Sequence, residues 1–134
     1  MGVSKDAPDL DIAYKLCEYA DVGRLKLSPG KPILPGRKQI FRLSENGADV
    51  RDVVAQADEH LPGRPLLEIV MRNGKRLAAG RVKLKSARAY ASQRIANLPE
   101  GIRGITPAEP PYPVEVSSEL SRYQKRVEDR VRAV

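Results

Sequence analysis

Apolar and polar residues alternate along the first third of the chain, which is the pattern of strands with one buried face. Within residues 12–19, the apolar side chains at alternate positions are Ile12, Tyr14 and Leu16. After Gly23, the leucines of Arg24-Leu25-Lys26-Leu27 alternate with cations. The two runs predict an antiparallel hairpin over residues 12–28, preceded by an irregular lead-in over residues 1–11.

The apolar spacing changes after the next predicted strand, which covers residues 39–43 and ends at Ser-Glu-Asn-Gly. Asp49 stands where a helix N-cap belongs, with Asp52 three residues later as a weaker capping-box partner. The apolar positions that follow have helical spacing and are Val50, Val53, Val54, Ala57 and Leu61. The sequence therefore predicts a short helix that ends at Pro62-Gly63.

The second half is predicted to contain one hairpin and two helices. Leu66–Met71 is the most apolar run, and Asn73-Gly74 after it is a strong turn signal, with a return strand from Lys75 to about Ala79. Ser86 is the expected cap of a helix that ends near Leu98. Residues 99–113 are rich in Pro and Gly and predict an extended connection. Ser117 or Ser118 is expected to cap a last helix with an apolar stripe, formed by Val116, Leu120, Tyr123, Val127 and Val131.

These elements predict an α+β fold with antiparallel β-hairpins and three helices, in the order β-β-β-α-β-β-α-α. With 134 residues, the chain suits one domain or a piece of one, and residues 12–134 are expected to form that unit. Phe is present once and Trp is absent, so aliphatic side chains must supply the core.

The positive charge is unevenly distributed, although the formal net charge is only +7. Between Asp21 and Glu45 there are six cations and no acid, and between Glu68 and Glu100 there are eight cations and no acid. Segregated charge of this kind attracts phosphates, nucleic acid or an acidic partner.

The first of these stretches contains a stiff basic loop. Pro29, Pro32 and Pro35 restrict its backbone, which lowers the entropy lost when a ligand orders it. Gly30 and Gly36 are expected to let backbone N–H groups approach an anion. With Lys31, Arg37 and Lys38, the loop suits phosphate or pyrophosphate. A solvated charged surface is the other interpretation.

Several other kinds of site are excluded by composition and spacing. A single histidine, His60, and a single cysteine, Cys17, do not make a metal site. The sequence contains no G-x-S-x-G, P-loop or G-x-G-x-x-G motif. No apolar run reaches the length of a membrane span, and the N-terminus lacks the pattern of a signal peptide. We therefore expect a cytoplasmic protein that does not interact with membranes.

Three stretches resemble one enzyme family. The stretch KLSPGKPILPGRKQIFR is similar to the family pattern KLSxGKxTLPGxKQVFR, and PLLEIVMRNGKRL is similar to PLLxxVMxxGKRL. The later segment ARAYASQRIANLPEGIRG, with the closing YPVEVS, resembles that family's late helix and L-P-E-G-x-R connection. The family is nicotinate phosphoribosyltransferase, and the resemblance lies in the part that follows its catalytic α/β barrel. It implies part of the smaller α/β domain of a type II phosphoribosyltransferase.

The resemblance also implies a reaction. Family members form nicotinate mononucleotide from nicotinate and 5-phosphoribosyl pyrophosphate in NAD salvage, with ATP and Mg²⁺ and a phosphorylated histidine on the barrel. The resemblance makes this chain the C-terminal portion of such an enzyme, inactive alone and binding no cofactor by itself. Its partners would be the upstream barrel portion and a second copy of the complete enzyme, in a homodimer. His60 does not match the catalytic histidine, so no catalytic residue is expected in this chain.

In that setting, the basic loop is expected to bind phosphate or pyrophosphate in trans, at the site of the other subunit. The residues expected to do so are Lys26, Lys31, Arg37 and Lys38. Two alternatives stay open. A small basic nucleic-acid-binding protein fits the charge, although the shortage of aromatic side chains for stacking speaks against it. A non-catalytic interaction subunit would dock through the apolar stripes of its late helices.

Overall fold

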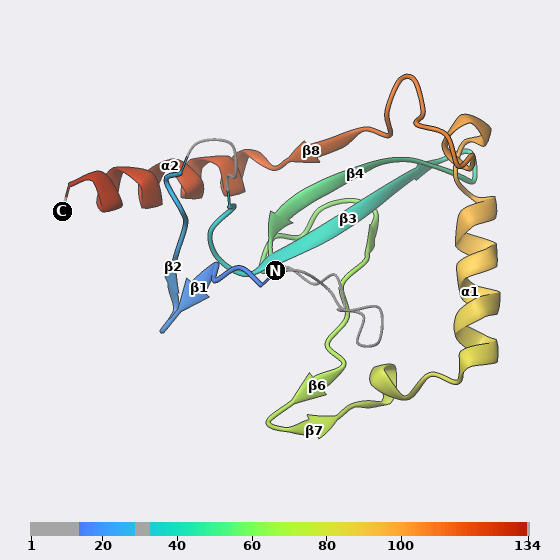
Figure 1. Ribbon diagram of the computed structural model, residues 1–134, viewed down its shortest axis with the longest axis horizontal. Coiled ribbons are helices and arrows are strands. Elements are labelled where there is room, and N and C mark those ends of the chain that lie inside the picture. The colour runs from blue at the N-terminus through green and yellow to red at the C-terminus, as the bar shows by residue number, and fades with distance from the viewer. Residues whose placement is uncertain (1–13, 29–32, 134) are drawn as a thin grey trace, which may run out of the picture.

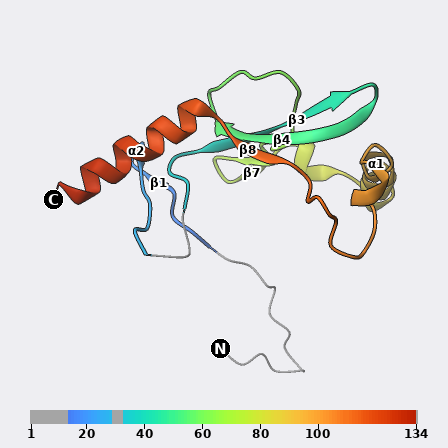
Figure 2. The ribbon, with the colours of Figure 1, turned by 90° about the horizontal axis from the view of Figure 1, so that it is seen from above.

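The computed structural model describes residues 14–28 and 33–133, so the predicted lead-in and Lys31 lie outside the described residues. Figure 1 shows an elongated molecule with a mixed sheet at its centre, helix α2 (Ser118–Arg132) at one end and helix α1 (Leu84–Ala96) at the other. Figure 2, turned by 90°, also places the two helices at opposite ends. The predicted α+β class with antiparallel hairpins is confirmed.

The central sheet has four strands in the order β5-β3-β4-β8. The long strands β3 (Lys38–Glu45) and β4 (Ala48–Gln56) form an antiparallel hairpin, and β5 (Arg64–Pro65) pairs antiparallel with β3. Strand β8 (Val114–Val116) lies parallel to β4, so the sheet is mixed. The sequence predicted residues 99–113 as a connection but missed the short strand that follows it.

Strand β4 replaces the predicted helix over residues 49–61, so that prediction was wrong. Asn46 and Gly47 have φ values of 50° and 83°, which suits a two-residue hairpin turn and sends the chain straight back along β3. Three β-branched residues, Val50, Val53 and Val54, favour the strand. The described residues therefore form two α-helices, where the sequence predicted three.

An irregularity in this hairpin explains why the spacing of Asp49 and Asp52 resembles a helix capping box. Ser44 pairs with Asp49 and Leu43 pairs with Arg51, so Val50 has no partner in the register and forms a bulge. In a regular strand, residues three apart point to opposite faces, but the extra residue brings Asp49 and Asp52 to the same face. The buried positions of β4 are Asp49, Asp52 and Ala55, whereas the valines from which the helix was predicted are only partly buried.

The core lies between the sheet and α2, which packs on β4. Among the described residues, the buried apolar side chains include Phe41 and Ala55 of the sheet and Leu120 and Val127 of α2. Ser117 caps α2 as predicted, because its hydroxyl accepts a hydrogen bond from the Leu120 amide at 3.0 Å. The predicted stripe is thus buried at its centre.

The two small hairpins are shorter than predicted. Strands β1 (Glu18–Tyr19) and β2 (Val22–Gly23) turn at Ala20 and Asp21, both at positive φ, so Gly23 lies within β2. Strands β6 (Met71–Arg72) and β7 (Lys75–Arg76) turn at Asn73-Gly74, which confirms that signal. The apolar run 66–70 between β5 and β6 forms no regular strand, so the prediction of a strand there was wrong.

Three helical segments complete the second half. A short 3₁₀ helix η1 (Ala78–Arg81) leads into α1, and a second, η2 (Glu100–Ile102), follows it. Helix α1 begins at Leu84, with Lys83 at the N-cap position, rather than at a cap on Ser86. The residues predicted to form its apolar face, among them Ala87, Ala91 and Ile95, are exposed in this chain.

Candidate functional site

The described part of the basic loop is bonded to the β1–β2 hairpin. The carbonyl of Cys17 accepts hydrogen bonds from the Arg24 amide at 2.8 Å and from the Gly36 amide at 2.7 Å. Satisfied backbone groups of this kind hold two segments in a fixed relation. The hairpin and residues 33–37 of the loop therefore form one unit. The Gly36 amide is used inside this unit, so the expectation that it contacts an anion was wrong.

Tyr123 of α2 connects this unit to the core through contacts with Gly23 and Gly36. Its hydroxyl accepts a hydrogen bond from the Gly23 amide at 3.1 Å. A Cβ atom on Gly23 would lie 2.3 Å from that hydroxyl oxygen, and a Cβ atom on Gly36 would lie 2.9 Å from Tyr123 Cε1. Gly36 also has a φ of 77°. Glycine is required at both positions because the tyrosine ring approaches the backbone closely.

A hollow of about 450 Å³ lies beside this unit, lined by Tyr14, Lys15, Leu16, Arg24, Leu25, Lys26 and Ile33. Three of these side chains are cationic and none is acidic. Lys15 and Arg24 were not among the predicted site residues. Arg24 lies two residues before Lys26 in the same acid-free stretch, whereas the β1–β2 hairpin brings Lys15 beside Lys26. A cluster of cations without an acid favours an anion of the size of a phosphate or pyrophosphate group.

The four predicted residues occupy different environments. Lys26 is exposed at the hollow, and Lys31 lies outside the described residues. Arg37 Nε lies 3.0 Å from a carboxylate oxygen of Glu18, although 76% of the Arg37 side chain is exposed. Arg37 lines a separate hollow of about 180 Å³ together with the acids Glu18 and Asp58. The structure therefore separates Arg37 from the acid-free hollow that contains Lys26.

The Lys38 side chain stabilises the basic loop by binding two of its backbone carbonyls. Its ammonium group donates to the carbonyl of Leu34 at 2.8 Å and to the carbonyl of Gly36 at 2.5 Å. An ammonium group has three donors, so one remains for a ligand. Lys38 also lines a third hollow, of about 340 Å³, which shares Lys15 and Ile33 with the Lys26 hollow.

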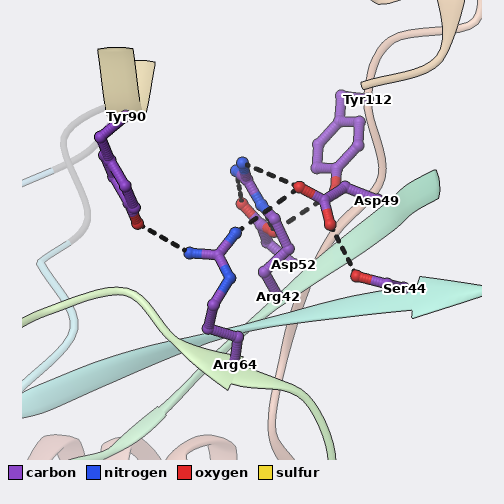
Figure 3. A network of polar contacts seen from close by, with 7 residues as sticks. All are labelled: Arg42, Ser44, Asp49, Asp52, Arg64, Tyr90 and Tyr112. Atoms are coloured by element: carbon purple, nitrogen blue, oxygen red, sulfur yellow. Dashed lines mark hydrogen bonds and ion pairs between the residues drawn. The ribbon is translucent and has the colours of Figure 1, made fainter. Parts of the chain in front are cut away.

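A second charged cluster lies on the sheet, between β3, β4 and β5 (Figure 3). Arg42 donates to the two carboxylate oxygens of Asp52, each at 2.8 Å. Asp49 is 2% exposed and accepts a hydrogen bond from the Ser44 hydroxyl at 2.6 Å. Arg64 lies 3.6 Å from Asp49. Two acids and two arginines face one another, so the cluster is neutral overall.

Two tyrosines connect this cluster to distant segments. Arg64 donates a hydrogen bond to the hydroxyl of Tyr90 of α1 at 3.2 Å, and the hydroxyl of Tyr112 donates to Asp52 at 3.4 Å. The hydrogen bond to Asp52 raises the pKa of Arg42, and burial followed by the charge of Asp52 raises the pKa of Tyr112. A paired, half-buried network of this kind holds elements together and has little charge left for a ligand.

Within the described ranges, no group of three or more His, Cys, Asp or Glu side chains is arranged to hold a metal ion. No described helix is long and apolar enough to cross a membrane.

Fold and hollow together define an α+β chain with a cationic, acid-free hollow beside its first hairpin. Over 118 residues the chain is 45% identical to the nicotinate phosphoribosyltransferase pncB2 of Mycobacterium tuberculosis, in strains CDC 1551 / Oshkosh and ATCC 25618 / H37Rv alike. The match covers 88% of this chain, and the chain spans 26% of the length of these curated relatives. No family model matches the chain. The comparison confirms the resemblance seen in the sequence, and its coverage is consistent with a C-terminal portion of that enzyme.

Proposed function

We propose that this chain is the C-terminal portion of a nicotinate phosphoribosyltransferase and acts in the cytoplasm with an upstream portion that carries the catalytic barrel. The observation that carries the proposal is the 45% identity over 88% of the chain to an enzyme of that name. The complete enzyme would form nicotinate mononucleotide in NAD salvage. A homodimer would place the basic loop of one subunit at the site of the other.

In the proposed reaction, the ring nitrogen of nicotinate forms a bond to C1 of the ribose of 5-phosphoribosyl pyrophosphate. The bond from C1 to the pyrophosphate oxygen breaks, and the pyrophosphate leaves with the electron pair. Negative charge grows on the leaving group, so fixed cations stabilise the transition state more than the bound substrate. Lys15, Arg24 and Lys26 supply three such cations around one acid-free hollow.

The other predicted residues have distinct proposed roles. Lys38 is a positioning residue with one donor free for phosphate, because its other two donors bind the Leu34 and Gly36 carbonyls. Lys31 and Arg37 are proposed as further phosphate ligands, and Arg37 would have to leave its contact with Glu18 to bind a phosphate. ATP, whose hydrolysis would drive the reaction, offers the same phosphate chemistry to these cations. Mg²⁺ would be held by phosphate oxygens of the substrate and by carboxylates that we assign to the upstream portion.

The test is formation of nicotinate mononucleotide from nicotinate, 5-phosphoribosyl pyrophosphate and ATP. The chain would be assayed alone and after co-expression with the upstream portion of the mycobacterial relative. We expect activity only in the mixture. Lys26→Ala should then lower the rate on the order of 10²-fold, as expected for loss of one charge-stabilising contact.

Lys125→Ala is the matched control, because Lys125 is an exposed lysine on α2, outside the residues that line the hollow. Its rate should match that of the unaltered chain. An active mixture that is insensitive to Lys26→Ala would remove the phosphate role from the hollow. An inactive mixture whose parts form a stable complex would contradict the proposed reaction.

A further inference from the structure

Residues 69–96 form a projection that we call the basic arm. It comprises β6, β7, η1 and α1 and extends away from the central sheet (Figure 1). The arm contains no acid, and its eight cations are Arg72, Lys75, Arg76, Arg81, Lys83, Lys85, Arg88 and Arg94. In the described part of the chain, the ion pairs involve other residues, and none of these eight cations lies within 4.0 Å of a carboxylate oxygen.

The arm also exposes large apolar side chains between its cations. Seven of them are 52–76% exposed: Ile69, Val70, Met71, Val82, Leu84, Tyr90 and Ile95. No residue of η1 or α1 is buried. A helix of 13 residues is marginal in water, and most helices in proteins are stabilised by packing of one face. The arm therefore has the composition of an interface that is covered in the working protein.

The N-terminal end of helix α1 lacks the acid that would complement the helix dipole, although Arg94 in the last turn suits the other end. Its first turn contains no acid, and Lys83 at the N-cap position makes no side-chain capping bond. Lys85 adds a second cation close to the positive end of the helix dipole, which is unfavourable without a compensating anion. Acidic side chains on a partner would satisfy the free N–H groups and the lysines together.

The arm is nevertheless held in a defined place on the sheet. Arg64 binds Tyr90 of α1, and the Asp49 amide donates to the carbonyl of Asn97 at the end of α1, at 2.8 Å. The same Asp49 side chain belongs to the buried cluster with Arg42 and Arg64. The cluster thus fixes the orientation of α1 before a partner binds. This lowers the conformational entropy that is lost on binding.

We propose that the basic arm is a docking surface for an acidic, partly apolar surface on the portion of the enzyme that lies outside this chain. This inference rests on the proposed function. The relatives are more than three times as long as this chain, whose match covers 26% of their length, so a large covering body is available. A second copy of the arm would carry the same charge and be repelled. Nucleic acid would leave the apolar side chains uncovered.

The test is the affinity between this chain and the co-expressed upstream portion, with hydrogen exchange as a second measurement. Arg88→Glu should weaken binding at least tenfold, and so should Leu84→Ser. The matched controls on α2, Lys125→Glu and Val131→Ser, should change the dissociation constant by less than twofold. Amides of α1 should exchange slowly only in the complex. Circular dichroism of each variant checks that the fold is retained.

Activity separates this inference from the proposed function. At saturating concentration, the Arg88→Glu chain should restore normal nicotinate mononucleotide formation, since the arm lies apart from the Lys26 hollow. An active mixture with unchanged affinity for both arm variants would overturn the docking surface and leave the proposed function intact. No binding and no activity would overturn both. Binding of a 20-nucleotide RNA that Arg88→Glu abolishes, without binding of the upstream portion, would replace the docking surface with a nucleic-acid site.

Discussion

The two halves of this molecule contain similar apolar side chains but bury them very differently. In the packed region, formed by β3, β4, β8 and α2, Leu120 and Val127 of the helix are almost fully buried against the sheet. In the basic arm, side chains of the same types are more than half exposed. Hydrophobicity alone therefore does not decide which residues form a core. The decision depends on whether the covering surface belongs to the same chain.

The same contrast appears in the charges. The packed half pairs Arg42 with Asp52 and places Asp49 beside Arg64, so its charges cancel locally. The eight cations of the arm have no such acids among the described residues. A region that satisfies its own charges is a scaffold, whereas an unbalanced region is suited to a partner of opposite charge.

The largest effect is expected from a pair of leucine substitutions, one in each half. Leu120→Ala removes a side chain that is 0% exposed in the core, and it should lower the free energy of unfolding by about 4 kcal/mol. Leu84→Ala removes a side chain that is 76% exposed, and its effect should stay within about 0.5 kcal/mol. Urea unfolding of the isolated chain measures both. Equal losses would show that the arm contributes to the same core.

A second comparison concerns two ion pairs of the packed half. Asp52→Ala leaves the half-buried Arg42 without its two 2.8 Å bonds, and it should cost about 3 kcal/mol. Glu115→Ala breaks the exposed pair with Arg51, and it should cost less than about 1 kcal/mol. Urea unfolding at pH 7 gives both values. If the two losses were equal, the burial of the Arg42–Asp52 pair in the cluster of Figure 3 would not increase its contribution to stability.

Local signals predicted part of the fold because they depend on neighbouring residues alone. The Asn73-Gly74 turn follows from the tolerance of both residues for positive φ, and the cap at Ser117 follows from its hydroxyl. The strand β4 did not follow, because its apolar residues happen to have helical spacing, and pairing with β3 across the Asn46-Gly47 turn decided the structure. The run 66–70 was predicted as a strand because its residues are mostly apolar. An apolar composition indicates that residues will be buried, but it does not show which surface will bury them.

The candidate site was predictable where its residues are close in the sequence. Lys26 belongs to the acid-free stretch that also gave Lys31, Arg37 and Lys38 as predicted phosphate-binding residues, but the structure places Arg37 at a separate hollow with Glu18 and Asp58. Lys15 could not be found in this way, because it belongs to an earlier segment that the β1–β2 hairpin folds back toward Lys26. The distinction between a free lysine and Lys38, which binds two carbonyls, also required the three-dimensional contacts.

The smallest effect is expected from Tyr112, which joins the connection before β8 to the cluster on the sheet. Burial and the charge of Asp52 raise its pKa above the ordinary value of 10.0, so the folded chain retains the phenol proton more strongly than the unfolded chain. This contribution to stability is fully present below about pH 10 and is lost as the pH rises through the folded pKa. Tyr112→Phe cannot ionise at this position. The variant should therefore lie within about 1 kcal/mol of the unaltered chain at pH 7, because the bond to Asp52 is long at 3.4 Å. Its free energy of unfolding, measured in urea at several pH values, should also fall less steeply above pH 10. If this free energy fell equally with pH for the variant and the unaltered chain, the cluster would not raise the pKa of Tyr112.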